Sequence, residues 1–153
     1  MSGGVRRELP GGFELDDDPG RVDVDAVHEF IANDSYWGRE RPRERTEAAI
    51  RGARRVVGLY HEGALVGFAR AVSDGATVAY LADVYVLPRY QGRGLGLELV
   101  REIVDGSEVA FGRGVRWMLH TADAQGLYTR IGFADRVTPY ALMERARDYD
   151  SAP

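Results

Sequence analysis

The sequence contains neither cysteine nor lysine. Without cysteine, the 153-residue chain has no disulfide bond, no thiolate metal ligand and no cysteine nucleophile. Since all 20 basic residues are arginine, it also has no Schiff-base lysine, no P-loop lysine and no lysine side chain on which it could acetylate itself. The arginine excess is typical of a GC-rich genome and carries no functional signal of its own.

Long apolar runs are absent as well. No segment approaches the ~20 apolar residues that a transmembrane helix needs. The start of the chain lacks the apolar core of a signal peptide. We therefore expect a cytoplasmic protein with no membrane partner. A formal net charge of −4 argues against a general nucleic-acid-binding protein.

The pattern of apolar residues predicts an α/β fold. The length favours one domain over residues 13–147, between a loose glycine-rich arm at 1–12 and a flexible tail at 148–153. Apolar alternation and turn residues predict strands over 13–18, 55–61, 64–73, 76–87, 115–121, from 133 onward and over 140–144. Helical periodicity predicts helices over 23–33, 43–53, 94–105 and 124–131.

A glycine-rich loop follows the longest predicted strand. The strand ends at Leu87, and Gly92, Gly94 and Gly96 precede an amphipathic helix. Glycines let backbone N–H groups approach a ligand closely, and a helix start adds unpaired donors with a partial positive charge. The pattern favours a pyrophosphate site, although the same glycines alone also fit an ordinary turn. The loop lacks the Gly-Lys-Ser/Thr ending of a Walker A loop and the spacing of a Rossmann fingerprint.

Two motifs resemble those of the GCN5-related N-acetyltransferase (GNAT) superfamily. Gln91, Gly94 and Gly96 match its central acyl-CoA-binding motif, Q/R-x-x-G-x-G/A. A second motif, A-x-x-L-Y-x-K/R-x-G-F, is matched downstream by Ala124, Leu127, Tyr128, Arg130, Gly132 and Phe133. Thr121 stands where many relatives carry asparagine, and threonine can still cap a helix or form a hydrogen bond.

The resemblance covers roughly residues 13–147 and implies both a fold and a cosubstrate. The implied fold is a mixed, mostly antiparallel sheet of about six to seven strands with about four helices, splayed at the central strand. The implied acyl donor is acetyl-CoA, and no metal is involved. The expected acetyl-CoA-binding residues lie on the central strand, in the glycine loop and at the later helix: Val84, Tyr85, Val86, Gln91, Gly92, Arg93, Gly94, Leu95, Gly96, Leu97, Ala124 and Tyr128.

Tyr128 is the expected general acid. By periodicity alone it fits a core tyrosine on the apolar stripe of its helix. The resemblance implies instead that its hydroxyl protonates the departing CoA thiolate, a transfer that contributes about 10²–10⁴-fold. Attack would be direct and in a ternary complex, because cysteine is absent and no serine is paired with a base.

Asp83 is the only charged residue between Tyr80 and Leu87. A buried carboxylate is costly unless it is paired or used. It could form a salt bridge with an arginine of a neighbouring strand or helix, or it could face the acceptor and attract or deprotonate an amine. His120, near the end of the next predicted strand, is a rival proton acceptor, although a structural role suits it as well.

The segment 34–43, between the first two predicted helices, is the expected acceptor pocket. Tyr36 and Trp37 lie there beside arginines, a combination that suits a carboxylate-bearing or aromatic substrate. Trp37 fits a core-covering role equally well. The string Ser35-Tyr36-Trp37, together with AYLADVYV, is similar to a subgroup of small bacterial GNAT proteins of unassigned substrate. Asp83 favours a cationic amine instead, so the chemistry of the acceptor stays open.

The resemblance therefore predicts an acetyl-CoA-dependent N-acetyltransferase acting on a primary amine of a small molecule or a peptide. The alternative is a non-catalytic acyl-CoA-binding or sensing module of the same fold, against which the retained Tyr128 argues. A homodimer is compatible with the sequence, since many members of the superfamily dimerise.

Overall fold

The structure is a computed structural model that describes residues 4–135 and 139–145. The chain divides into two compact units, Met1–Asp123 and Ala124–Pro153. Within the described residues, no helix is both long and apolar enough to cross a membrane. The flexible tail expected at 148–153 lies outside the described residues.

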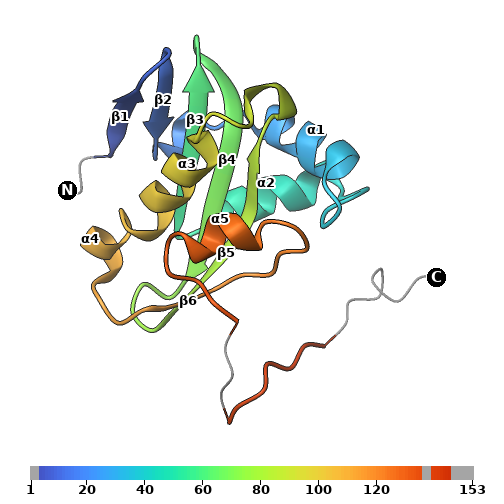
Figure 1. Ribbon diagram of the computed structural model, residues 1–153. Coiled ribbons are helices and arrows are strands. Elements are labelled where there is room, and N and C mark those ends of the chain that lie inside the picture. Colours follow the sequence, from blue (N-terminus) through green and yellow to red (C-terminus); the bar gives the residue numbers. More distant parts are fainter. Residues whose placement is uncertain (1–3, 136–138, 146–153) are drawn as a thin grey trace. The chain divides into compact units, whose positions relative to one another are not determined.

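The first unit is built on a sheet. Six strands of its described residues pair in the spatial order β1-β2-β3-β4-β5-β6 (Figure 1). The strands are β1 Arg6–Leu9, β2 Phe13–Asp16, β3 Arg55–His61, β4 Ala64–Ser73, β5 Val78–Val86 and β6 Arg116–Met118. Neighbouring strands are antiparallel from β1 to β5, whereas β5 and β6 are parallel. The mixed, mostly antiparallel sheet expected from the sequence is confirmed.

The N-terminal strand corrects one expectation. Residues 6–9 are not part of a loose arm, because they pair with β2 as an antiparallel hairpin. Gly11 and Gly12 close this hairpin with φ values of 82° and 79°, a left-handed conformation that glycine adopts without strain. The glycines that suggested looseness are therefore the residues that form the turn.

Two helices cover one face of the sheet. They are α1 Val24–Asp34 and α2 Arg43–Gly52, within two residues of the predicted ranges. Val27 and Ile31 of α1 and Ile50 of α2 pack in one core cluster with Tyr60 of β3 and Phe68 of β4. Asp23 begins α1, since its carboxylate accepts a hydrogen bond of 3.0 Å from the backbone N–H of Ala26.

A third helix, α3 Leu95–Val104, covers the opposite face (Figure 1). Its predicted apolar stripe is buried, with Leu99, Val100 and Ile103 fully enclosed. Arg55 of β3 ties this helix to the sheet, because its guanidinium pairs with both Asp17 and Glu102. A short helix, α4 Glu108–Phe111, follows in a segment for which the sequence analysis predicted no element.

The sheet opens between β5 and β6. The two strands pair only from Val78↔Arg116 to Tyr80↔Met118. Beyond that point β6 ends, whereas β5 continues through residues 81–86. No strand among the described residues pairs with this free edge of β5. The open edge is the splay that the resemblance implied at the central strand.

The second unit contains one described helix, α5 Gln125–Thr129, inside the predicted range 124–131. The strand expected over 140–144 is wrong, because the described residues 139–145 form neither helix nor strand. Tyr140 and Met143 are 84% and 89% exposed. The strand expected from 133 onward is absent from residues 133–135, and residues 136–138 lie outside the described part of the chain.

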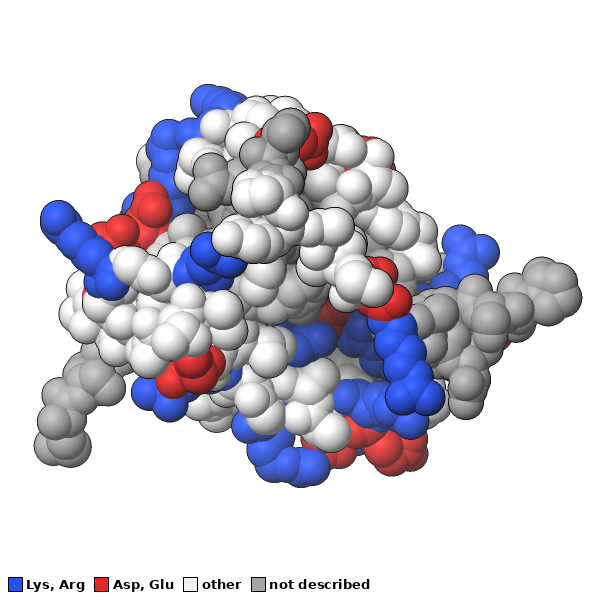
Figure 2. Space-filling model, turned by 90° about the horizontal axis from the view of Figure 1, so that it is seen from below, with Lys and Arg blue, Asp and Glu red and all other residues white. Residues whose placement is uncertain are grey.

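Charged side chains connect elements on the surface of the first unit. Arg43, at the start of α2, pairs with Asp25 of α1 at 2.5 Å and with Glu47 at 3.0 Å. Basic and acidic side chains are interspersed on the face drawn in Figure 2. Exposed pairs of this kind contribute about 0–1 kcal/mol each, so packing rather than charge holds α1 and α2 in place.

Candidate functional site

The loop between β5 and α3 begins with one tight turn. Pro88–Tyr90 form a 3₁₀ turn, in which the backbone N–H of Tyr90 donates to the carbonyl of Leu87 at 2.9 Å. The side-chain amide of Gln91 then donates to the carbonyl of Val86 at 2.9 Å. Gln91 thereby fixes the loop to the end of the strand and sets the direction in which the glycines continue.

Two glycines of this loop have left-handed backbone angles. Gly92 and Gly94 both have φ of 78°, which other residues rarely adopt. A Cβ added at either position would meet no atom within 4 Å. Glycine is therefore required there for its backbone angles, and the space in front of the loop is open. Gly94 precedes α3 without any side-chain cap.

The backbone N–H groups from Gly92 to Leu97 form a run of unpaired donors. None of them donates a hydrogen bond to another described residue, and the first bonded amide after them is that of Glu98. Arg89 precedes the run and Arg93 lies within it, and both guanidinium groups lie near the Tyr90 ring, 4.9 and 5.7 Å from its centroid. Unpaired amides at a helix start, beside two arginines, suit a phosphate or pyrophosphate group.

The free edge of β5 can contribute only backbone groups at Tyr85. Its side chain is buried and stacks on Phe30 of α1, with the ring centroids 4.0 Å apart. Burial raises the pKa of the Tyr85 hydroxyl well above its ordinary range. Val86 is also buried. The side chains of this strand hold it in the core, and its edge stays available to a ligand that pairs with backbone groups.

Asp83 occupies a β-bulge. Between the pairs Phe68↔Tyr85 and Arg70↔Ala82, two residues of β5 stand opposite one residue of β4. Asp83 has φ of 53°, a left-handed angle that aspartate tolerates better than most residues. The bulge changes the direction of its side chain.

Four donors surround the Asp83 carboxylate. Arg41 binds it through two nitrogens, at 2.8 Å to Oδ2 and 3.1 Å to Oδ1. The Arg70 Nε atom lies 2.7 Å from Oδ2, and the Trp37 indole nitrogen lies 3.0 Å from Oδ1. Burial raises the pKa of Asp83, but the hydrogen bonds and charges of the two arginines outweigh it and hold the pKa below its ordinary value. The salt bridge that the sequence left as one alternative for Asp83 is present, and both carboxylate oxygens are occupied.

The segment between α1 and α2 is anchored at two points. Trp37 contacts the core cluster and donates to Asp83. The hydroxyl of Tyr36 accepts a hydrogen bond of 2.8 Å from the backbone N–H of Ala122, which follows β6. Tyr36 is 53% exposed, and its ring meets that of Trp37 edge-on at 5.0 Å. The two aromatic residues predicted for the acceptor pocket therefore have different surroundings: Trp37 is half-buried against the core cluster and Tyr36 is at the surface.

His120 lies beyond β6 and contacts β5. Its Nδ1 atom is 2.5 Å from the hydroxyl of Tyr80, and the two rings are tilted with centroids 5.6 Å apart. The contact orients the imidazole beside the splayed strands.

Tyr128 belongs to the second unit, on α5. The helix begins after Ala124, whose carbonyl accepts hydrogen bonds from the N–H groups of Leu127 and Tyr128 at 3.0 and 3.3 Å. The Tyr128 ring meets that of Phe133 edge-on at 5.8 Å. The residues of the second sequence motif therefore form one local helix–turn structure.

Two residues of the Asp83 cluster escaped the sequence analysis as individual candidates. Arg70 is the only charged residue in the apolar strand β4, which is the same signal that singled out Asp83 on β5. Arg41 was noted only as one of several arginines in its segment, and no local pattern marks it as the partner of Asp83.

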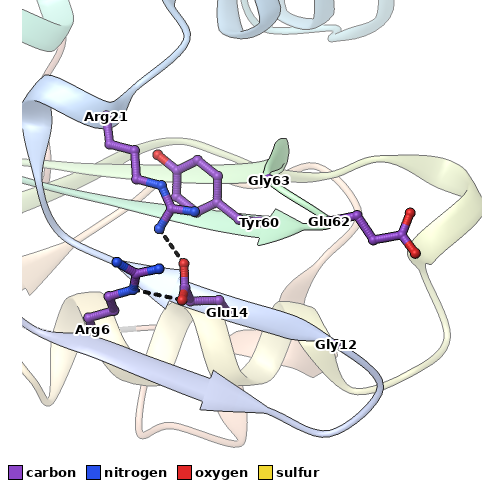
Figure 3. A pocket seen from close by; sticks show the side chains of 7 residues that line it. All are labelled: Arg6, Gly12, Glu14, Arg21, Tyr60, Glu62 and Gly63. Atoms are coloured by element: carbon purple, nitrogen blue, oxygen red, sulfur yellow. Dashed lines mark hydrogen bonds and ion pairs between the residues drawn. The ribbon is translucent and has the colours of Figure 1, made fainter.

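A separate cavity of about 280 Å³ lies among β1, β2 and β3 and is lined by Arg6, Gly12, Glu14, Arg21, Tyr60, Glu62 and Gly63 (Figure 3). Arg6 and Arg21 both point to Glu14 and pair with it. Arg21 also pairs with Asp16 and lies over the Tyr60 ring, 3.8 Å from its centroid. The acidic groups of this cavity balance its arginines, so it offers no unmatched charge to a ligand.

Comparison with known proteins gives the family. The chain matches the Acetyltransferase (GNAT) family over residues 24–133. A crystal structure from Xanthomonas campestris pv. campestris, provisionally described as an acetyltransferase belonging to the GNAT family, is 34% identical with a TM-score of 0.82. That match covers 92% of this chain and 96% of the other.

Two curated relatives agree. A protein of Gibberella zeae, provisionally named an acetyltransferase, is 30% identical in an alignment 118 residues long that covers 63% of this chain and 66% of the relative. An uncharacterized N-acetyltransferase of Pyropia yezoensis is 28% identical in an alignment 104 residues long that covers 65% of this chain and 59% of the relative. The chain thus spans about two thirds or less of the length of these curated relatives. The chain belongs to the GNAT family of acetyltransferases.

Proposed function

We propose that the chain is an acetyl-CoA-dependent N-acetyltransferase that moves an acetyl group to a primary amine by direct attack in a ternary complex. The run of unpaired N–H groups from Gly92 to Leu97 carries the proposal, because it offers consecutive donors to the pyrophosphate of CoA. Arg89 and Arg93 add positive charge on the same loop. Membership of the GNAT family supports acyl transfer in general.

The free edge of β5 supports the same donor. The amides of a pantetheine arm can pair with the backbone of residues 84–86, as a peptide strand adds to a sheet. This path starts at the glycine loop and runs back along β5 toward Asp83. The reacting thioester would then lie near the β-bulge, beside the segment that carries Tyr36 and Trp37.

An attacking amine must first lose a proton, because only its free base is nucleophilic. Asp83 is poorly suited to accept that proton, since both of its oxygens are occupied and its pKa is lowered. We assign to Asp83 the role of holding Arg41 and Arg70. Water or His120 then receives the proton of the amine.

Tyr128 is assigned the opposite proton transfer. As the tetrahedral intermediate collapses, the C–S bond breaks and the sulfur takes the electron pair, and the phenol hydroxyl donates its proton to that sulfur. The match of Tyr128 and its neighbours to the second family motif supports this assignment.

The alternative is an acyl-CoA sensor that binds without turnover. A CoA-release assay with a panel of primary amines, run beside a thermal-shift titration with acetyl-CoA, separates the two. The proposal predicts a thermal shift, amine-dependent CoA release and an acetylated product detectable by mass spectrometry. A thermal shift with no release on any amine favours the sensor, and no thermal shift contradicts both.

A further inference from the structure

The cluster around Asp83 carries more positive than negative charge. Arg41 and Arg70 share this one carboxylate, and neither pairs with a second acid among the described residues. The two arginine side chains are only 15% and 14% exposed, and the Asp83 side chain is 3% exposed. One guanidinium charge is therefore left without a counterion in a mostly buried place, which is costly.

Two other largely buried arginines of the first unit are matched by more carboxylate groups. Arg21 pairs with both Glu14 and Asp16. Arg55 pairs with both Asp17 and Glu102. Arg6 shares Glu14 with Arg21, so that cluster holds two arginines and two acids. Arg7 shares Glu102 with Arg55 and also pairs with Glu98, so that cluster holds two arginines and three acids. Each of these clusters supplies at least one carboxylate for each arginine, whereas the Asp83 cluster supplies one carboxylate for two.

Arg70 also retains unused donors. It binds Asp83 through Nε, and its two Nη groups donate to no other described residue. Arg41, in contrast, uses both of its Nη atoms on the same carboxylate. A guanidinium presents planar, paired N–H groups that match a carboxylate or phosphate group. The free Nη groups of Arg70 are suited to bind such an anion.

The position of the cluster links it to the acceptor. Asp83 directly precedes the strand edge at residues 84–86 that we assign to pantetheine, so the two are neighbours in the chain. Arg41 and Trp37 bring the segment between α1 and α2 to the same point. An anion bound by Arg70 would accordingly lie near the acyl end of the donor rather than at its pyrophosphate.

We infer that the acceptor is an amine that also bears a carboxylate or phosphate group, and that this anion binds to Arg70 beside Arg41. The inference rests on the proposed function and specifies its acceptor. Bound in this way, the anion neutralises the surplus charge of the cluster and orients the amine toward the thioester.

A competing surface favours the opposite charge. A cavity of about 190 Å³ lies between α1 and the ends of β4 and β5, and Glu29 and Asp34 contribute to its lining together with Phe30 and Tyr85. Neither carboxylate pairs with an arginine among the described residues. A polyamine would suit this cavity better than the Asp83 cluster, so the test includes one.

Matched acceptors test the inference on the unaltered protein. Amino acids are compared with their amides, O-phosphoethanolamine with ethanolamine, and putrescine is added as a dication. The inference predicts a kcat/KM at least ~10-fold higher for the anionic member of one pair or both. The pair with the larger ratio of kcat/KM values shows whether the preferred anionic group is a carboxylate or a phosphate. Equal or faster turnover of the amides, ethanolamine or putrescine overturns the inference while leaving N-acetyl transfer intact.

Variants of Arg70 test whether this residue causes the preference for an anionic acceptor. Arg70→Gln is expected to raise KM for the anionic acceptor about 10-fold or more and to abolish its advantage over the neutral partner, while the thermal shift with acetyl-CoA persists. Arg70→Lys is expected to restore part of that advantage. Arg21→Gln, which removes an arginine already matched by two acids, serves as the control and should leave the ratio unchanged. An unchanged ratio in Arg70→Gln overturns the inference, and absence of acetyl-CoA binding by the unaltered protein overturns the proposed function with it.

Discussion

Arg41 donates hydrogen bonds to the Asp83 carboxylate from both Nη atoms, at 2.8 and 3.1 Å, although the two residues are 42 positions apart in the sequence. This pair joins the segment between α1 and α2 to the β-bulge of β5. It couples the segment expected to form the acceptor pocket to the strand expected to bind the donor. We therefore expect the stability of the protein and its proposed acceptor preference to depend on the same carboxylate.

Asp83→Asn is expected to destabilise the fold by about 3–5 kcal/mol, because it leaves two mostly buried arginines without a counterion. Chemical denaturation of the variant and the unaltered protein measures the difference. A general-base role makes a different prediction, namely a large loss of kcat and of the acidic limb of its pH profile with stability little changed. That result would contradict the role assigned here.

The contribution of Asp83 to stability is expected to disappear in acid. Its pKa in the folded protein lies below the ordinary 3.8, so the unfolded chain binds the proton more readily. The stabilisation is complete above about pH 5 and is lost as the pH falls through the lowered folded value. The difference in unfolding free energy between the unaltered protein and Asp83→Asn should stay constant from pH 7 to about pH 5 and shrink below about pH 4. A difference that grows in acid would contradict this.

The Asp83 cluster shows which features of the candidate site can be predicted from the sequence and which cannot. The odd charge of Asp83 on an apolar strand is a local signal, and it marked the position. Its partners are not local: Arg70 is 13 residues away and Arg41 is 42 residues away, and only the fold brings them together. A sequence pattern shows that a buried charge needs a partner but not which of 20 arginines supplies it.

The helices and strands also divide into those that local sequence patterns predict and those that they do not. The glycine loop and α3 were predictable, because turn residues and helical periodicity act over a few positions. The hairpin of β1 and β2 was missed, since Gly11 and Gly12 signal flexibility and a left-handed turn equally well. The strand expected at 140–144 was wrong because apolar alternation is only a weak local signal for a strand.

Tyr60→Phe is expected to leave stability at pH 7 unchanged or to increase it by about 1 kcal/mol. The Tyr60 hydroxyl is buried and has no hydrogen-bond partner among the described residues, so its removal relieves an unsatisfied polar group. Burial raises the pKa of this tyrosine to about 12. Because the raised pKa favours the neutral hydroxyl in the folded protein, the associated stabilisation is complete below the unfolded pKa of about 10. This stabilisation is lost as the pH rises toward 12. Urea titrations of Tyr60→Phe and the unaltered protein at pH 7 and pH 11 test both expectations. A marked loss of stability of the variant at pH 7 would contradict the first.

Gly94→Ala tests the loop conformation against a matched control. Gly94 and Gly63 both have left-handed φ values, 78° and 83°, and open space where a Cβ would lie. Alanine should cost about 1 kcal/mol of stability at either position. Only Gly94→Ala is expected to weaken acetyl-CoA binding, by about 10-fold, because Gly63 lies in the turn between β3 and β4. Equal weakening by both variants, measured by calorimetric titration, would remove the loop from the donor site.

Tyr128→Phe tests the proton transfer to sulfur. Loss of the hydroxyl is expected to lower kcat about 10²-fold or more and to leave the affinity for acetyl-CoA unchanged, because the group acts only as the thiolate departs. Tyr60→Phe, at a tyrosine of the first unit with no assigned catalytic role, is the matched control and should retain full kcat. A Tyr128→Phe variant with normal kcat would show that the thiolate leaves without this acid.

The central claim is that acetyl-CoA binds at the unpaired amides of residues 92–97. Titration of the isotope-labelled protein with acetyl-CoA, followed through backbone amide resonances, tests it most directly. The account predicts that the largest shifts fall on residues 92–97, with further shifts along the edge at 84–86. Saturable binding that leaves the amides of residues 92–97 unmoved would contradict it.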